Sequence, residues 1–255
     1  MSHWTQELFV DQAEHYAADI EMRLDEAAEE TEDLLDLLED DHDLDPDSAL
    51  DVACGCGRHA VPLAEQGLDV DGVDISPEFV ERAGDRADAD GVADRTLFVE
   101  GDMRDFGDAP LREEYDLVTC FFTSFGYFED ETNREVLAEM ADHVAPGGAV
   151  VLQLANKDRL LANFNTSSAF EHGGYLVTEQ REFDVTYSRV ETTRRMFEEN
   201  GDEYEFAFEG ELSIRLYSPV ELRKLFEDVG LEPHLYGSPE AKTSTASPTS
   251  STSSA

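Results

Sequence analysis

Positive charge is scarce in this sequence, and lysine is the scarcest cation. Among 255 residues, 18 are Lys or Arg and 60 are Asp or Glu, so the formal net charge is -42. The lysines are Lys157, Lys224 and Lys242. No basic stripe follows any segment, and phosphate contacts weaken steeply with salt. Nucleic acid is therefore not expected as a partner.

The acidic residues are spread from residue 7 to residue 232 instead of forming one acidic tail. In dilute buffer such self-repulsion destabilises a compact state. Salt removes the problem, because the Debye length falls to roughly 3 Å at 1 M. An acid-rich, lysine-poor chain with 40% apolar residues therefore indicates a halophilic protein from a high-salt, haloarchaeal cytoplasm.

Cysteine is also rare, and long apolar runs are missing. The three cysteines, Cys54, Cys56 and Cys120, are an odd number and imply no disulfide framework. Cys54 and Cys56 have no second ligand pair at zinc-like spacing, so no metal is expected. No run reaches the ~18 apolar residues of a membrane span, and the N-terminus is acidic where a signal peptide would be basic. We expect a cytoplasmic protein without a membrane partner.

Strands alternate with helices between residues 46 and 160. Apolar segments bounded by turn signals predict strands at Ala49–Ala53, Asp69–Asp74, Thr96–Glu100, Tyr115–Phe122 and Ala149–Leu154. Between them, helices are predicted over Arg58–Gln66, from Pro77 onward behind a Ser76 cap, and over Thr132–Val144. Such repeats form a mostly parallel sheet with right-handed crossovers. The fold class is therefore α/β and Rossmann-like, with helices on both faces of the sheet.

The flanking segments have different patterns. Residues 1–45 predict N-terminal helices, and residues 161–217 predict an antiparallel β insert, or lid, with about three strands and a turn at Asn200-Gly201-Asp202. Residues 218–237 predict a return helix, opened by a capping box at Ser218, and a short strand at Leu231–Tyr236 that completes the core. Residues 238–255 are rich in Ser and Thr and predict a disordered tail.

The loop after the first strand predicts a nucleotide-type cofactor site. Gly55 and Gly57 allow close approach of a ligand to the backbone, and the next helix offers free N–H groups. Asp74 ends the second strand, where a carboxylate can accept both ribose hydroxyls. The glycines alone are ambiguous, because Gly55, Gly57 and Ala60 also fit the dinucleotide fingerprint.

Three further features favour S-adenosylmethionine. Asp51 precedes the glycines, where an acid suits an ammonium group and not a pyrophosphate. Asp102 and Met103 follow the third strand, where an acid can accept the adenine amino group and Met can pack on the ring. An aromatic loop, residues 121–128, follows the fourth strand, near the switch point at which such sheets bind ligands.

Residues 48–155 resemble the core of class I S-adenosylmethionine-dependent methyltransferases. Leu50 to His59 resembles the first motif of that family, and Val73-Asp74 resembles the second. Gly101-Asp102-Met103 resembles the third, and Pro146-Gly147-Gly148 the turn after the core. These motifs occur in the order and at the spacing of the family.

The stretches Phe122–Phe128 and Arg215–Ser218 resemble a subgroup with a β-rich lid that includes sugar N-methyltransferases. Ala53 stands where many members have glycine, and Cys56 where Thr or Ser is common. The family's sheet closes with an antiparallel seventh strand, which the Ser/Thr-rich end cannot supply. We therefore expect an incomplete sheet or a truncated or altered end.

The resemblance implies which residues serve the site. Cofactor contacts are expected from Tyr16, Asp51, Ala53, Cys54, Gly55, Gly57, Arg58, Asp74, Ile75, Asp102, Met103 and Phe121. Substrate contacts are expected from Ser124, Tyr127, Arg215 and Tyr217, with Tyr127 as the candidate catalytic residue. The sulfonium cofactor is already activated, so positioning for in-line displacement supplies most of the catalysis.

The expected function is methyl transfer to an amine, hydroxyl or carboxylate of a small molecule, by a monomer or homodimer. Two alternatives stay open. A nicotinamide-dependent oxidoreductase would use the same glycines, and a cofactor-binding protein without turnover would tolerate the missing strand.

Overall fold

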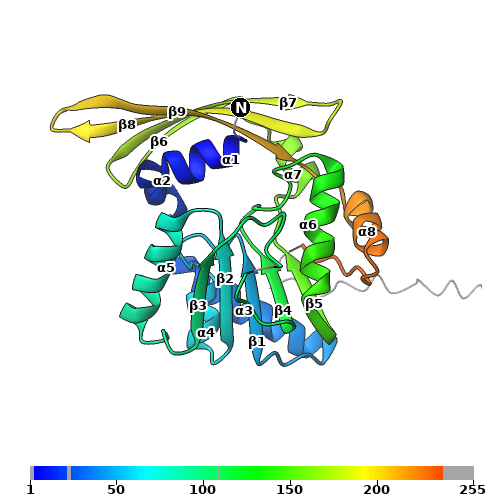
Figure 1. Cartoon of the computed structure of the whole chain (residues 1–255). Helices are drawn as coiled ribbons and strands as arrows, with labels where there is room; N and C mark the ends of the chain where they lie inside the picture. The colour runs from blue at the N-terminus through cyan, green and yellow to red at the C-terminus, as the bar shows by residue number, and fades with distance from the viewer. Residues whose placement is uncertain (1–2, 22–23, 108, 238–255) are drawn as a thin grey trace, which may run out of the picture.

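The computed structural model describes residues 3–21, 24–107 and 109–237. The tail predicted at residues 238–255 lies outside this part of the chain. Five strands form a parallel sheet in the order β3-β2-β1-β4-β5 (Figure 1). They are β1 Ser48–Val52, β2 Asp69–Asp74, β3 Thr96–Glu100, β4 Tyr115–Cys120 and β5 Val144–Leu152. The strand order reverses between β1 and β4, which makes their carboxyl ends the expected binding edge.

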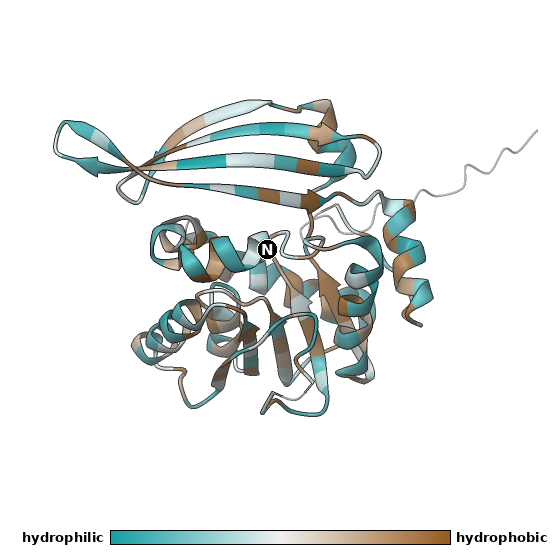
Figure 2. Ribbon diagram, turned by 45° about the horizontal axis from the view of Figure 1, so that its top comes forward, coloured by the Kyte–Doolittle hydropathy of each residue, from teal (hydrophilic) through white to brown (hydrophobic). Residues whose placement is uncertain are grey.

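Helices cover both faces of this sheet, as expected. On one face, α3 (Leu24–His42), α4 (Ala60–Glu65) and α5 (Pro77–Asp90) bury apolar residues against β1, β2 and β4. On the other face, α6 (Asp130–Asp142) and α8 (Pro219–Asp228) pack against the same strands. Figure 2 shows the brown, apolar strands enclosed by helices with teal outer surfaces.

Local signals set the helix ends at two places. Ser76 accepts a hydrogen bond from Phe79 N–H at 3.4 Å, and Pro77 occupies the first turn of α5. The Ser218 side chain and Glu221 form a complete capping box at the start of α8. Both contacts satisfy N–H groups that the helix leaves without partners.

A second, antiparallel sheet forms the lid, in the order β6-β7-β8-β9. Its strands are β6 Ser167–His172, β7 Tyr175–Asp184, β8 Arg189–Asn200 and β9 Glu203–Arg215, one more than predicted. The short helix α7 (Lys157–Ala162) leads into it. The extra strand, β6, alternates half-buried and exposed residues, so its apolar signal is weak.

The N-terminal helices lie between the lid and the core (Figure 1). They are α1 Trp4–Gln6, a π-helical turn at Glu7–Asp11, and α2 Ala13–Ile20. One apolar cluster joins Leu8 and Tyr16 of these helices to Phe79 of α5 and to Met196 and Phe208 of the lid. The lid therefore reaches the core largely through the N-terminal helices.

Two expectations near the sheet edge are wrong. Leu231–Tyr236 forms no strand; the Tyr236 hydroxyl and His42 of α3 lie within hydrogen-bond distance, at 2.9 Å. Pro146-Gly147-Gly148 is not a turn before the fifth strand but lies within β5, opposite a register shift between Tyr115 and Leu117. Within the described part of the chain, the parallel sheet therefore ends at β5.

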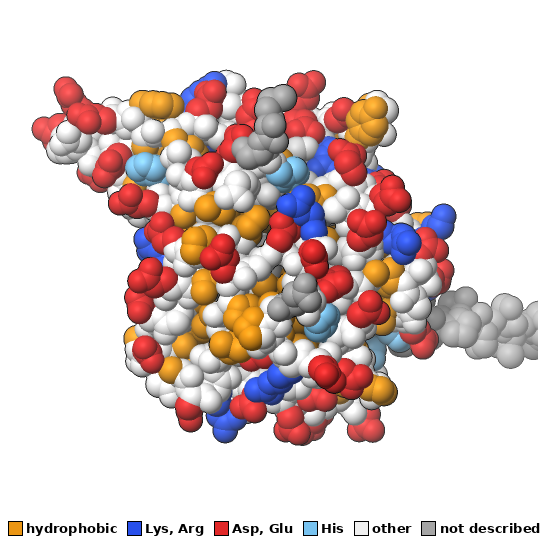
Figure 3. All heavy atoms as spheres, viewed as in Figure 1, with side chains coloured by type: hydrophobic (Ala, Val, Ile, Leu, Met, Phe, Trp, Pro, Cys, Tyr) orange, Lys and Arg blue, Asp and Glu red, His pale blue; other side chains and the backbone are white. Residues whose placement is uncertain are grey.

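Acidic side chains dominate the face drawn in Figure 3, with a few scattered basic groups. Many of the basic groups pair with acids, for example Arg82 with Glu21 and Glu78. Among the described residues, no helix has the length and apolar content that a bilayer-spanning segment needs.

Candidate cofactor and acceptor site

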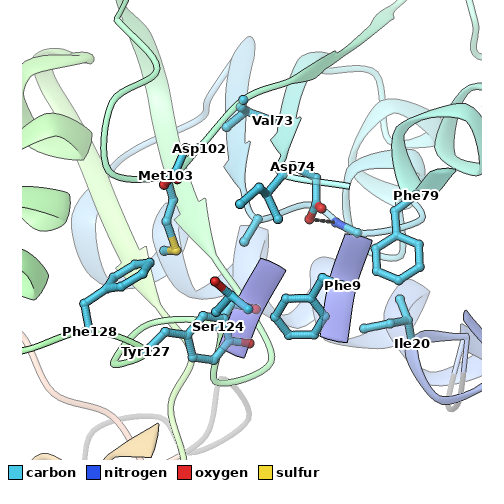
Figure 4. A pocket seen from close by; sticks show the side chains of 15 residues that line it. Phe9, Ile20, Val73, Asp74, Phe79, Asp102, Met103, Ser124, Tyr127 and Phe128 are labelled. Atoms are coloured by element: carbon cyan, nitrogen blue, oxygen red, sulfur yellow. Dashed lines mark hydrogen bonds between the residues drawn. The ribbon is translucent and has the colours of Figure 1, made fainter. Parts of the chain in front are cut away.

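A cavity lies at the carboxyl ends of the parallel strands, under the N-terminal helices. It holds about 540 Å³ of space between protein atoms, part of it open to solvent. Its lining combines strand ends, the β4–α6 loop and N-terminal helices (Figure 4): Thr5, Phe9, Ile20, Ala53, Gly55, Val73, Asp74, Ile75, Phe79, Gly101, Asp102, Met103, Ser124, Tyr127 and Phe128.

Asp74 is the buried carboxylate of this cavity. One oxygen accepts a hydrogen bond from Gly55 N–H at 2.9 Å, and the other accepts from Ser76 N–H at 2.9 Å. Burial raises the pKa of Asp74 to about 6, although both amide hydrogen bonds lower it. Each oxygen retains a further lone pair, so Asp74 can still accept from ligand hydroxyls.

Asp51 lies in β1, two residues before Ala53, and does not itself line the cavity, where a cofactor contact was expected of it. Its carboxylate is 2% exposed and accepts a hydrogen bond from the Thr119 hydroxyl at 2.9 Å. Burial and, to a smaller extent, the nearby charge of Asp74 raise the pKa of Asp51 to about 7, although the Thr119 hydrogen bond lowers it. An ionised Asp51 is therefore poorly compensated in the free protein.

The loop between β1 and α4 has three left-handed residues: Ala53 (φ 60°), Gly55 (φ 54°) and Gly57 (φ 74°). A Cβ on Gly55 would come 3.2 Å from the Ile20 side chain, so glycine lets α2 close on the loop. Ala53 adopts the same conformation with a side chain, which costs about 1–2 kcal/mol. The replacement of glycine by Ala53 is therefore accommodated, with strain.

Asp102 and Met103 line the opposite wall. Arg104 holds the Asp102 carboxylate through its side chain and its backbone N–H. Burial pushes the pKa of Asp102 upward, but the Arg104 hydrogen bonds outweigh this and keep the pKa below its ordinary value. Asp102 is thus an ionised acceptor at neutral pH. Phe128 lies beside Met103 in Figure 4 and adds a flat apolar surface to this wall.

One end of the cavity is aromatic. Tyr127 and Ser124 point into it from the β4–α6 loop, opposite Phe9 (Figure 4). The Trp4 ring contacts Tyr127 edge-on, with 4.9 Å between centroids. Burial raises the pKa of Tyr127 far above its ordinary value. Tyr127 is therefore a neutral hydroxyl at physiological pH and not a base.

Several expected site residues have other partners. Arg58 is buried, bonds Glu30 at 3.0 Å and lies over the Phe122 ring. Phe121 stacks on His59 with 4.0 Å between centroids, in the cluster under α3 and α4. Phe121 points into the cluster beneath α3 and α4, and neither Arg58 nor Phe121 lines the cavity, where cofactor contacts were expected of them.

The two residues expected to contact substrate from the end of the lid have other partners. Arg215 bonds Asp130 at 2.9 Å and Glu221 at 2.7 Å, so it fastens the lid to α6 and α8. The Tyr217 hydroxyl accepts from the Asn133 amide at 2.9 Å inside the core. Neither residue lines the cavity.

Three remaining candidates support the cavity from behind. Cys54 is buried, and Gly57 packs against Val61 and Ala83 of neighbouring helices. The Tyr16 ring contacts Phe9, which lines the cavity, and its hydroxyl accepts from Arg194 of the lid at 2.9 Å. Tyr16 therefore acts through Phe9 in this structure.

The sequence indicates Tyr16 as the contribution of the N-terminal helices, but three other residues of these helices line the cavity. Thr5, Phe9 and Ile20 line the cavity, together with Phe79 of α5. The apolar spacing in the first 20 residues signals a buried helix face. It does not signal that this face covers a ligand site.

Comparisons with known proteins agree with this architecture. Residues 49–148 match the family described as "Methyltransferase domain". A sugar N,N-dimethyltransferase of Streptomyces venezuelae, named for dTDP-3-amino-3,4,6-trideoxy-alpha-D-glucopyranose, is 34% identical over 127 residues, 49% of each chain. A glycine/sarcosine N-methyltransferase of Parasynechococcus marenigrum is 30% identical over 189 residues, 72% of this chain and 63% of the relative.

Solved structures agree over a larger part of the chain. The DesVI structure from Streptomyces venezuelae is 27% identical, has a TM-score of 0.68, and is matched over 91% of this chain and 95% of its own. A methyltransferase structure from Clostridium acetobutylicum shares the fold, with a TM-score of 0.70 at 18% identity over 86% of both chains.

By fold and sequence the chain resembles class I S-adenosylmethionine-dependent methyltransferases, and among them the sugar N-methyltransferases. It spans 38 to 63% of the length of the first three curated relatives that it matches.

Proposed function

We propose that this protein transfers a methyl group from S-adenosylmethionine to an amine nitrogen of a small molecule. The observation that carries the proposal is the cavity itself: a buried carboxylate, Asp74, faces apolar and aromatic walls at the switch point of a parallel sheet. The relatives named as N-methyltransferases support nitrogen over oxygen as the acceptor atom.

The residues present fit this cofactor. Asp74 would accept hydrogen bonds from the ribose hydroxyls through its unused lone pairs, and Met103 and Phe128 would flank the adenine. Asp102 would accept a hydrogen bond from the adenine amino group. Asp51 favours the ammonium group through its charge, across the loop that carries Ala53. A pyrophosphate at the same place would meet two buried carboxylates, which disfavours a nicotinamide nucleotide.

S-adenosylmethionine supplies an activated methyl group, so the protein residues have to position and desolvate the acceptor. Phe9, Ser124 and Tyr127 form the walls at that end. The neutral Tyr127 hydroxyl oxygen can accept a hydrogen bond from an amine N–H, which leaves the nitrogen lone pair free to attack, but it cannot remove a proton at neutral pH. The acceptor amine therefore has to bind in its neutral form, and the rate should rise with pH toward the pKa of that amine.

Calorimetry with S-adenosylmethionine in molar KCl tests the cofactor, and a panel of matched primary amines, alcohols and carboxylates tests the acceptor. We expect micromolar binding and methylation of amines, with amino sugars and small amino acids as the first compounds to try. Absence of binding, or tighter binding of a reduced nicotinamide nucleotide, would refute the cofactor. Binding without transfer to any member of the panel would favour a cofactor-binding protein without turnover.

A further inference from the structure

A buried arginine ties the lid to the loop that carries the acceptor wall. Arg189 begins β8 and is 8% exposed. Its guanidinium donates to three consecutive carbonyls of the β4–α6 loop: Phe128 O at 2.8 Å, Tyr127 O at 3.1 Å and Gly126 O at 3.4 Å. The remaining contacts go to Ser213 of β9, at 2.7 Å to its hydroxyl and 2.8 Å to its carbonyl.

The donor pattern is unusual for a buried arginine. Its nearest carboxylate is Glu191, at 4.0 Å and half exposed, so carbonyl dipoles supply most of the compensation. The planar five-donor fork of arginine can satisfy several acceptors in a fixed geometry. A lysine has three donors on one nitrogen and cannot reach the same set.

The loop has little freedom once it is held in this way. Arg215 N–H donates to Gly126 O at 2.8 Å, and a Cβ on Gly126 would lie 2.7 Å from Arg215 O. The Asn133 side chain accepts from Phe128 N–H and donates to Phe128 O. With the carbonyls of Tyr127 and Phe128 fixed toward the lid, both side chains line the cavity (Figure 4).

We propose that Arg189 is a positioning residue for methyl transfer. It acts through the backbone of residues 126–128, so that Tyr127 keeps its place in the acceptor wall, and Phe128 its place beside Met103, when the lid packs on the core. This inference rests on the proposed function, because the wall matters only if an acceptor binds there. A displacement of about 1 Å at a reacting centre can cost roughly 100-fold in rate.

The test compares Arg189→Lys, and Arg189→Gln as a second variant, with two matched controls. The first control, Arg215→Lys, changes the residue that pairs with Arg189 across the two strands and is buried to the same extent. Arg215 also ties the lid to the core, but it does so through carboxylates of α6 and α8. Arg195→Lys alters an arginine of the same strand that pairs with Glu209 at the surface. We expect kcat of both Arg189 variants to fall about 100-fold. Arg195→Lys should keep wild-type kcat.

Binding and fluorescence separate positioning from simple loss of stability. Asp74, Asp102 and Met103 are untouched, and Phe128 alone of the proposed cofactor walls is affected, so the S-adenosylmethionine Kd of Arg189→Lys should change less than about tenfold, which leaves the loss mainly in kcat. The chain has one tryptophan, and Trp4 contacts Tyr127, so its emission reports the loop in the absence of ligand. We expect a red-shifted Trp4 emission in the Arg189 variants. Arg215→Lys should lower the melting temperature without that shift.

Any of three outcomes overturns the proposal. The first is a wild-type kcat in both Arg189 variants. The others are a Trp4 emission that is unchanged in the Arg189 variants, and an emission shift that is equally large in Arg215→Lys. If the wild-type protein binds S-adenosylmethionine but methylates no amine, the proposed function fails separately. The emission comparison then still decides whether Arg189 holds the loop.

Discussion

Binding of S-adenosylmethionine should release protons between pH 6 and pH 8, because two carboxylates are buried at the site. The pKa of Asp51 is raised to about 7 and that of Asp74 to about 6, in both cases first by burial. The free protein therefore holds a proton at Asp51 near neutral pH. A ligand that brings an ammonium group favours the ionised carboxylate, so affinity must rise as pH passes upward through 7.

The size of the effect follows from these values. A group with a pKa of 7 is about ten times less ionised at pH 6 than at pH 8, and half-ionisation of Asp74 at pH 6 adds a factor of about two. We expect Kd to be about 20-fold weaker at pH 6 than at pH 8. The same burial destabilises the free fold. Relative to an unfolded chain that ionises near pH 4, Asp51 costs up to about 4 kcal/mol as pH rises from 4 to 7.

Calorimetry at pH 6, 7 and 8, in buffers of different ionisation enthalpy, counts the protons directly. A matched ligand, 5′-methylthioadenosine, keeps the adenosine part and lacks the ammonium group. For this ligand, the change in Kd near pH 7 should be absent, and the smaller change near pH 6 should remain. Asp51→Asn should remove the same change near pH 7 for the full cofactor. A Kd that does not vary with pH, or equal proton release with both ligands, would refute the assignment of Asp51 to the ammonium group.

Three other predictions concern single features. Asp74→Asn should weaken cofactor binding by ~1–3 kcal/mol in calorimetry, because buried ribose hydroxyls lose an acceptor. The control Asp69→Asn, at the exposed start of the same strand, should leave the affinity unchanged. Equal losses of affinity in the two variants would remove Asp74 from the site. Gly126 and Gly67 have the same φ of 107°, but only at Gly126 would a Cβ lie 2.7 Å from a backbone oxygen. Chemical denaturation should therefore show a larger loss of unfolding free energy for Gly126→Ala than for Gly67→Ala. Equal losses would contradict the clash. The melting temperature should rise steadily between 0.1 M and 3 M KCl, because salt screens a net charge of -42; a melting temperature independent of KCl would contradict the halophilic interpretation.

Local signals along the chain predict much of the core. The bounds of β2 and β3 match the predicted strands residue for residue, and α5 starts at Pro77 behind Ser76 as expected. These elements depend on apolar segments, turn residues and caps that lie within a few positions of each other. Asp74, Asp102 and Met103 could be located for the same reason, since each lies at or just after the end of a strand.

Contacts between distant segments could not be predicted in this way. Arg58 and Phe121 look like site residues by motif position, but partners about 30 and 60 residues away, Glu30 and His59, engage them. Leu231–Tyr236 has the apolar content of a strand, but no strand pairs with it in the described part of the chain. A strand depends on a partner ladder, which sequence periodicity cannot supply.

Surface charge and buried charge should differ in what they contribute to binding. In dilute buffer a net charge of -42 attracts any cation, including a sulfonium, without selectivity. At molar salt the Debye length is roughly 3 Å, so exposed acids act only on contact, whereas buried groups are screened much less. The ratio of Kd between Asp51→Asn and wild type should therefore stay constant from 1 M to 3 M KCl. A matched exposed acid, Glu100 at the end of β3, should show no effect as Glu100→Gln at either salt concentration. A ratio for Asp51 that falls toward one with added KCl would mean that Asp51 acts as a surface charge, and that cofactor selectivity arises elsewhere in the cavity.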